Sequence, residues 1–263
     1  MADILDVLHA RCAEAILSVG DHPTLTRIPT VLDQRTAPRP APARPAASPA
    51  TPPTTSRPPT ERIHWPRARF APSVVAMNER YLNVVDVEAT CWEGPNPPGQ
   101  PSEIIEIGLC VVDSATWERV ERHSILVRPA RSSVSEFCTR LTTLTQEQVD
   151  TGLEFAEACE LLRSEYRSDS RPWASWGDYD RKQFETQCAT TRVPYPFGAR
   201  HTNAKRAFSE SFGTTRRYGM AGALRMREIP LEGTHHRGGD DAWNIANLII
   251  DMARRDTWPG RTG

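Results

Sequence analysis

A proline-rich stretch divides this chain and limits where a compact domain can form. Eleven of the 23 prolines lie between Pro38 and Pro72, interspersed with Ala, Thr, Ser and Arg. Proline removes a backbone donor and fixes φ, and a segment with so little apolar content cannot bury enough surface to fold. We therefore expect residues 21–75 to form a disordered, partly polyproline linker, and a folded domain to follow it.

A short amphipathic pattern precedes this linker. Apolar residues recur at three- and four-residue spacing within residues 3–19, at Ile4, Leu5, Leu8, Cys12, Ile16 and Leu17. This period predicts a helix over residues 1–20 whose apolar face cannot be buried by the helix alone. Self-association, packing on the main domain and docking to a partner protein all remain open for it.

The part of the chain after the linker has the pattern of one mixed α/β domain. We place this domain at residues 76–257, a sufficient size for a single core, and expect a disordered tail at 258–263. Runs rich in Val, Ile and aromatic residues predict strands at 81–87, 104–112, 118–127 and 172–176. Three strands in succession and then a strand between helices favour a mixed sheet flanked by helices.

Helical patterns follow the third of these strands. Thr145 and Gln148 have the spacing of a capping box, which we expect to open a helix that continues through Phe155, Cys159 and Leu162. Two later helices are predicted by apolar stripes at Phe184, Cys188, Ile245, Leu248, Ile249 and Met252.

The composition argues against several functional classes. The chain has no run of about 18 apolar residues, and its first 20 residues lack the basic start and apolar core of a secretory signal. We therefore expect a cytoplasmic protein without a membrane-bound segment. The six cysteines occur singly, without zinc-site spacing. A net charge of −1 argues against binding nucleic acid by charge alone, but not against meeting phosphate through bound cations.

Two acidic residues at the end of the first strand give the sharpest chemical signal. Asp86 and Glu88 end the apolar run Val84-Val85-Asp86-Val87-Glu88. Residues i and i+2 of a strand point to the same face, so the two carboxylates project together. Such a half-buried pair is costly unless a cation lies between its members, although a chance pair of exposed acids gives the same pattern.

Two downstream segments place further acids at the ends of structural elements. Asp180 follows the fourth predicted strand and stands four residues before Phe184. His236 stands five residues before Asp241, which opens the last predicted helix. The three acidic segments are therefore able to converge on one rim of the sheet.

These residues resemble the three exonuclease motifs of the DEDDh superfamily. The motifs are DxE on the first strand, DxxxF entering a middle helix, and HxxxxD opening the last helix. The similarity extends to the subgroup that contains the 3′ histone mRNA exonuclease and bacterial KapD-like proteins. It rests on DVEATCWE at 86–93, EIIEIG at 103–108, VRP at 127–129, SEFC at 135–138, LTTLTQEQVD at 141–150 and HRGGDD at 236–241.

The resemblance implies an RNase H-like fold, with a mixed five-stranded sheet, and a site for two ions of Mg²⁺ or Mn²⁺. Carried over position by position, Asp86, Glu88, Asp180 and Asp241 are the metal-binding carboxylates and His236 is the general base. Hard oxygen ligands suit these ions, and a neutral imidazole is able to take a proton from an attacking water.

The resemblance also implies a site for the terminal nucleotide. Its residues are Ala89, Thr90, Phe137, Leu141, Thr142, Tyr179 and His236. Phe137 and Tyr179 occupy the positions where relatives sandwich the terminal base, although Phe137 also suits a core position. Backbone groups at Ala89 and Thr90 resemble the sugar-contacting segment, together with the region of Leu141 and Thr142.

Neighbouring titratable residues do not fit the motif spacing. Asp178 is not four residues before Phe184, and His235 is six residues before Asp241. We expect structural roles or solvation for these residues and for Asp240.

The sequence thus predicts a metal-dependent 3′-to-5′ exonuclease that releases 5′-mononucleotides from RNA 3′ ends, with single-stranded DNA as the alternative substrate. A non-catalytic RNA-binding or scaffold protein with the same fold remains a rival hypothesis. A DNA-directed proofreading exonuclease is a third, which differs from the first only in its substrate.

Overall fold

The computed structural model describes residues 79–259, in which five strands form one mixed sheet. The strands are β1 (Tyr81–Ala89), β2 (Ile104–Asp113), β3 (Glu118–Leu126), β4 (Trp173–Ser175) and β5 (His201–Asn203), in the spatial order β3-β2-β1-β4-β5. The β1/β2 and β2/β3 pairs are antiparallel, and β1/β4 and β4/β5 are parallel. The expected mixed five-stranded sheet is confirmed. The predicted helix at 1–20 and the linker at 21–75 lie outside the described residues.

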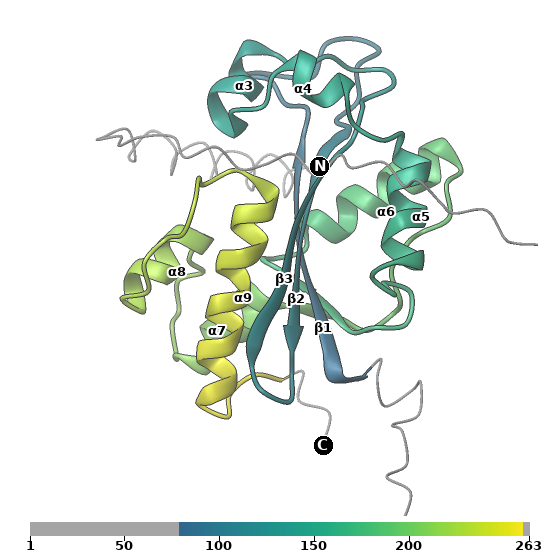
Figure 1. The fold of residues 1–263 in the computed structure, drawn as a ribbon. Coiled ribbons are helices and arrows are strands. Elements are labelled where there is room, and N and C mark those ends of the chain that lie inside the picture. The colour runs from purple at the N-terminus through teal and green to yellow at the C-terminus, as the bar shows by residue number, and fades with distance from the viewer. Residues whose placement is uncertain (1–78, 260–263) are drawn as a thin grey trace, which may run out of the picture. The chain divides into compact units, whose positions relative to one another are not determined.

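Helices cover both faces of this sheet, as Figure 1 shows. They are α3 (Glu136–Thr142), α4 (Gln146–Asp150), α5 (Phe155–Ser164), α6 (Tyr179–Thr191), α7 (Ala204–Ser211), α8 (Met220–Met226) and α9 (Gly238–Arg254). Helices α7, α8 and α9 lie on one side and α5 and α6 on the other, while α3 and α4 lie at the end where β1 finishes. No helix in residues 79–259 is long and apolar enough to cross a membrane.

The alternation of β1 divides its side chains between two cores. Leu82 and Val84 pack with apolar residues of α7, α8 and α9, whereas Val85 and Val87 pack with those of α5 and α6. By the same alternation, the even-numbered residues that follow Val84 face α9. The first core also includes Trp258, which is 3% exposed, so the packed domain reaches one residue past the expected boundary at 257.

One helix expected from the sequence is two helices in the structure. The capping box of Thr145 and Gln148 is present, but α4 ends at Asp150, and α5 begins at Phe155 with its own box of Glu154 and Glu157. Between them, Leu153 forms a parallel bridge with Val127. A backbone segment that bonds to a strand cannot also continue a helix, so this pairing separates the two helices.

The sheet and α9 meet at a close contact between glycines. A Cβ atom added to Gly108 would lie 1.8 Å from the carbonyl oxygen of Gly238. A Cβ atom added to Gly238 would lie 3.2 Å from the carbonyl oxygen of Asp86. Gly108 is paired with Asp86 in the β1/β2 register, so α9 begins directly against the strand positions that carry the first acids. Glycine is required here because backbone atoms fill the space of a side chain.

Replacing Gly108 with alanine should therefore destabilise the fold. Overpacking a core typically costs about 1–3 kcal/mol, and backbone atoms cannot rotate away from the added methyl, so we expect at least about 3 kcal/mol. Urea unfolding of wild type and Gly108→Ala measures this loss. Gly94→Ala is the matched control, because an added Cβ there has no atom within 4 Å. Equal midpoints for Gly108→Ala and wild type would contradict the close contact.

Candidate active site

Three carboxylates from two elements form a cluster at the end of β1. Asp86 and Glu88 come from β1 and Asp241 from the first turn of α9, and their ligand atoms all lie within 4.8 Å of one another. Asp86 is 1% exposed, Glu88 3% and Asp241 2%. The strand alternation that places Leu82 and Val84 against α9 also directs the first two acids towards the third.

Asp180 joins this cluster from the opposite side of the sheet. Strand β4 ends at Ser175, which leaves the end of β1 without a strand partner on that edge. The backbone N–H of Val87, between the two acids of β1, donates to Oδ1 of Asp180 at 3.0 Å. Asp180 is 0% exposed and lies in the first turn of α6. Three of the four carboxylates predicted from the sequence thus lie within 4.8 Å of one another, and the fourth, Asp180, is bonded to the backbone between two of them.

The electrostatics of this arrangement favour a bound cation. Carboxylates buried within a few ångströms of each other repel, and burial disfavours their charged forms. A divalent ion with a preference for oxygen ligands offsets both effects, since its charge dominates a site of this size. The acid cluster therefore fits divalent cations that prefer oxygen ligands.

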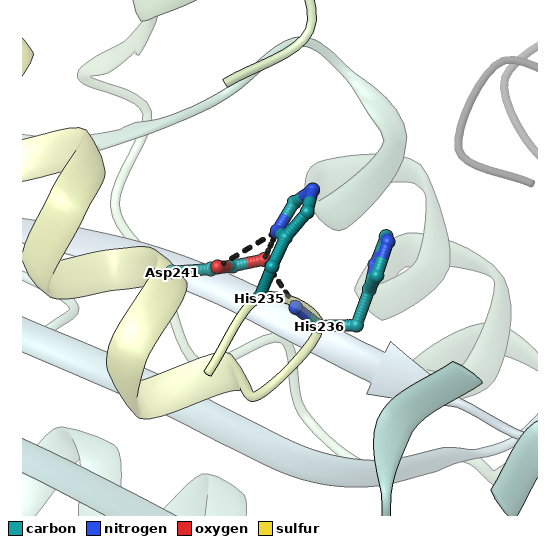
Figure 2. Close-up of side chains that lie close together, drawn as sticks. All are labelled: His235, His236 and Asp241. Atoms are coloured by element: carbon teal, nitrogen blue, oxygen red, sulfur yellow. Dashed lines mark hydrogen bonds and ion pairs between the residues drawn. The ribbon is translucent and has the colours of Figure 1, made fainter. Parts of the chain in front are cut away.

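Two adjacent histidines border Asp241 (Figure 2). Nδ1 of His235 lies 3.1 and 3.0 Å from the two carboxylate oxygens of Asp241. The backbone N–H of His236 donates to Asp241 at 3.1 Å, and the imidazole of His236 stacks on that of His235 with 3.9 Å between ring centres. His236 is 4% exposed and has a φ of 65°, a conformation uncommon outside glycine. Its ring is held by backbone position and by stacking.

Asp178 and Asp240 have structural partners. Asn203 donates to Asp178 at 2.8 Å, which ties the turn before α6 to the end of β5. Asp240 forms an ion pair with Arg122 and accepts from the backbone N–H of Thr234 at 2.6 Å. His235, by contrast, contacts a residue of the cluster directly, which motif spacing did not indicate.

Glu106 is a supporting residue that the sequence analysis missed. It is 0% exposed, and its oxygens accept from the Arg237 guanidinium at 3.1 Å on both sides and from the backbone N–H of Gly238 at 2.9 Å. Ser124 donates to it as well. A carboxylate at the first N–H of a helix is favoured by the helix dipole. The sequence did contain a signal for this role. Glu106 stands between apolar residues in the segment EIIEIG, and a buried acid of this kind needs a partner.

Removing Glu106 should destabilise the start of α9. Breaking a buried ion pair by deleting one partner typically costs about 3–5 kcal/mol, and we expect the lower end for Glu106→Ala because Arg237 is partly exposed. Urea unfolding tests this value. Glu121→Ala deletes a carboxylate from an exposed pair on β3, and should change stability by less than about 1 kcal/mol. Equal effects of the two variants would contradict the supporting role.

Helix α3 is fastened to the end of β1. The hydroxyl of Ser135 caps the helix and donates to the carbonyl of Cys91 at 2.6 Å, and the thiol of Cys138 donates to the carbonyl of Ala89 at 3.6 Å. Phe137 and Leu141 are partly exposed and pack against the small apolar cluster beneath this helix. The nucleotide residues expected on α3 are therefore held beside β1.

Two of the expected nucleotide residues are engaged within the protein. The N–H of Thr90 donates to Glu103 at 2.8 Å, and its hydroxyl accepts from the N–H of Glu103 at 2.9 Å. The hydroxyl of Thr142 donates to Cys138 at 2.9 Å and accepts from Leu144 at 3.1 Å. Both residues are 0% exposed, so their side chains hold the shape of this region.

The turn before α6 is supported from β4 and β5. Tyr179, partly exposed, is the first residue of α6 and packs against the core under α5 and α6. The hydroxyl of Ser175 is 3.0 Å from Nε2 of His201 and also donates to the carbonyl of Gly177. Burial lowers the pKa of His201 to about 4, so its imidazole is neutral near pH 7.

The depressed pKa of His201 predicts a loss of stability in acid. In the unfolded chain an imidazole titrates near about 6.5, so the unfolded state takes up this proton first as the pH falls. The contribution of neutral His201 is complete above about pH 6.5 and is lost as the pH falls towards about 4. Urea unfolding at several pH values should show wild type losing more stability over this range than His201→Gln. Parallel curves for the two proteins would contradict the prediction.

Comparison with known proteins gives a consistent set of similarities. Residues 84–249 match the family model RNase_T, described as Exonuclease. The chain is 30% identical over 185 residues to the human protein "3'-5' exoribonuclease 1", covering 65% of this chain and 52% of that protein. It is 29% identical over 175 residues to "Probable 3'-5' exonuclease KapD" of Bacillus subtilis (strain 168), covering 66% of this chain and 84% of that protein.

A solved structure is similar over the same region. The nuclease domain of 3'hExo, a DEDDh family member bound to rAMP, superposes with a TM-score of 0.62 at 28% identity. The alignment covers 67% of this chain and 93% of that domain. The chain thus matches nearly the whole of a nuclease domain, but only about half the length of the human relative.

Proposed function

This chain belongs to the RNase_T exonuclease family, and from that premise we propose that it hydrolyses phosphodiester bonds from the 3′ end of a nucleic-acid strand and releases 5′-mononucleotides. The observation that carries the proposal is the buried cluster of Asp86, Glu88 and Asp241, with Asp180 bonded to the intervening strand. A cluster of this kind has no structural purpose in an apolar strand end unless it binds cations.

In this proposal Asp86, Glu88, Asp180 and Asp241 hold two divalent ions, Mg²⁺ or Mn²⁺. Two such ions, when bound, would stabilise the charge on the attacking and leaving oxygens of the displacement at phosphorus. The carboxylates fix the position of the scissile phosphate relative to the water. The contact of His235 with both oxygens of Asp241 has to loosen when that carboxylate binds a cation.

We assign the general base to His236. The backbone N–H of His236 donates to Asp241, so the imidazole of His236 lies beside the acid cluster. A neutral imidazole takes the proton of the attacking water as the new bond to phosphorus forms. The stacked ring of His235 limits the rotation of the His236 ring.

The terminal nucleotide binds in this proposal between α3 and the start of α6. Phe137 and Tyr179 are partly exposed aromatics on these two helices, and stacking on such rings holds any base with about 1–3 kcal/mol. Backbone groups at Ala89 and Thr90 and the region of Leu141 and Thr142 form the sugar side, and the buried side chains of the two threonines hold its shape. A contact to the 2′-hydroxyl there favours RNA over DNA. The human relative is named an exoribonuclease, which supports the same preference.

Loss of one acid should abolish the activity. Asp86→Asn keeps the size of the side chain but removes the charge that a divalent ion needs. We expect its cleavage of 3′-recessed or single-stranded RNA in Mg²⁺ or Mn²⁺ to fall at least about 1,000-fold, and His236→Ala to lower it about 100- to 10,000-fold, the range of general base catalysis. Gel analysis of 5′-labelled RNA measures shortening from the 3′ end.

The controls separate this proposal from its rivals. Glu93→Gln removes an exposed acid close to the same strand end, and should retain wild-type activity. EDTA should stop cleavage, and added Mg²⁺ or Mn²⁺ should restore it. Wild-type protein that binds RNA 3′ ends but shortens no substrate in either metal would support the scaffold hypothesis. Faster cleavage of DNA than of RNA of one sequence would support the proofreading type.

A further inference from the structure

The connection between α7 and α8 carries cations that have no acidic partner. In the region that the structure describes, most arginines form ion pairs, as Arg119 does with Glu232 and Arg227 with Asp251. Arg216, Arg217 and Arg225 are exposed, and none of the ion pairs within residues 79–259 includes them. We call these three residues, with Tyr218, the basic surface.

This basic surface is connected through Trp176 to the part of the sheet that carries the acid cluster. The indole N–H of Trp176 donates to the carbonyl of Tyr218 at 3.1 Å. Trp176 follows β4 directly, and extending the parallel register in which Val84 pairs with Ala174 brings Trp176 level with Asp86. Helix α8 also packs against α9, the helix that carries Asp241. The basic surface therefore lies on the β4 and α9 side of the catalytic end of the sheet.

Two cations of this surface, Arg216 and Arg225, lie beside one aromatic ring. The guanidinium carbon of Arg216 lies 5.4 Å from the centre of the Tyr218 ring. A Cβ atom added at Gly222 would lie 3.4 Å from the Tyr218 ring and 3.8 Å from the Arg225 guanidinium, so both flank the same point of α8. The ring itself rests on Phe208 at 6.5 Å. Packing thus orients Arg216 and Arg225 without neutralising them.

We propose that the basic surface binds the phosphodiester backbone of the single strand whose 3′ end occupies the acid cluster. The proposal rests on the proposed function, because it assigns the path of the same substrate. Guanidinium groups form paired hydrogen bonds with phosphate oxygens, and a tyrosine ring stacks on bases of any sequence. Neither the net charge of −1 nor the four carboxylates attract a polyanion, so local cations at the rim supply that attraction.

The basic surface lies outside the reacting centre, so the test compares a substrate that is able to reach it with one that is not. A strand has phosphates upstream of the scissile bond, whereas the p-nitrophenyl ester of a 5′-mononucleotide has none. Arg216→Ala/Arg217→Ala in the full chain should bind an RNA of about 12 nucleotides at least about ten-fold more weakly than wild type. Fluorescence anisotropy with a phosphorothioate-linked, labelled RNA in Mg²⁺ measures this affinity without cleavage.

Salt dependence and the small ester provide the second and third readouts. The slope of log affinity against log salt concentration is negative, and each lost phosphate contact reduces its magnitude by about 0.7, so the slope of the double variant should be less steep than that of wild type by about 1.4. For the same 12-nucleotide RNA with ordinary phosphodiester linkages, the kcat/KM of the double variant should fall by the same factor as its affinity. Its hydrolysis of the ester should equal that of wild type.

A matched control removes the same charge elsewhere. Arg192 and Arg254 are also exposed, at the far ends of α6 and α9, and absent from the same ion pairs. At about 1.5 Å per residue they lie about 18 and 20 Å along these helices from Asp180 and Asp241. Arg192→Asn/Arg254→Ala, with asparagine because φ of Arg192 is 60°, should keep wild-type affinity and salt slope.

Three outcomes would overturn the inference. Wild-type RNA affinity and salt slope in the double variant would mean that no phosphate is bound there, which is also the result expected if the surface serves an acidic protein partner. An equal fall in ester hydrolysis would place the effect in the reacting centre or the fold. Failure of the wild-type protein to bind the RNA would contradict the premise that the chain binds a single strand. If the RNA binds through the basic surface but is never cleaved, the proposed function fails and this inference stands.

Discussion

The contact between Gly108 of β2 and Gly238 at the start of α9 is the constraint on which the rest of the site depends. Backbone atoms occupy the place of a side chain at Gly108, so α9 begins directly on the strands. Because Gly108 pairs with Asp86, this approach brings the first turn of α9, and Asp241 with it, to the acids of β1. In a close-packed interior a displacement at this contact moves the neighbouring residues, because there is no free volume to absorb it.

The site concentrates negative charge, and the protein offsets it in different ways at different positions. Glu106 is balanced by Arg237 and by the first N–H of α9, and Asp180 accepts from the N–H of Val87 where β4 has ended. Both arrangements use backbone groups that a helix start or a strand end leaves available. The cluster of Asp86, Glu88 and Asp241 is of the kind that divalent cations stabilise, and the proposed role of the basic surface is to add attraction for substrate at the rim.

Most of the sheet was predictable because its two central strands, β1 and β2, are dense runs of Val, Ile and Leu bounded by turns. The limits of β2 and β3 differ from the prediction by one residue, whereas the position of β5, with three residues, was not predicted because it offers no pattern to detect. The split between α4 and α5 was missed for another reason. It is set by the bridge between Leu153 and Val127, and a long-range backbone pairing leaves no local periodicity. The contact of His235 with Asp241 likewise depends on the path of the loop before α9 and not on motif spacing.

The sequence by itself determined the family and predicted which residues carry the chemistry. Alternation on β1 requires Asp86 and Glu88 to share a face, and the ordered motifs identified Asp180, His236 and Asp241 with the correct family. Only the tertiary structure decided how these residues are supported and what surrounds them. It places Glu106 against Arg237, Asp180 on the backbone of Val87, and the carbonyl of Tyr218 on the indole of Trp176. The reason is that periodicity fixes the direction of a side chain within its own element, whereas partners from other elements are fixed by packing.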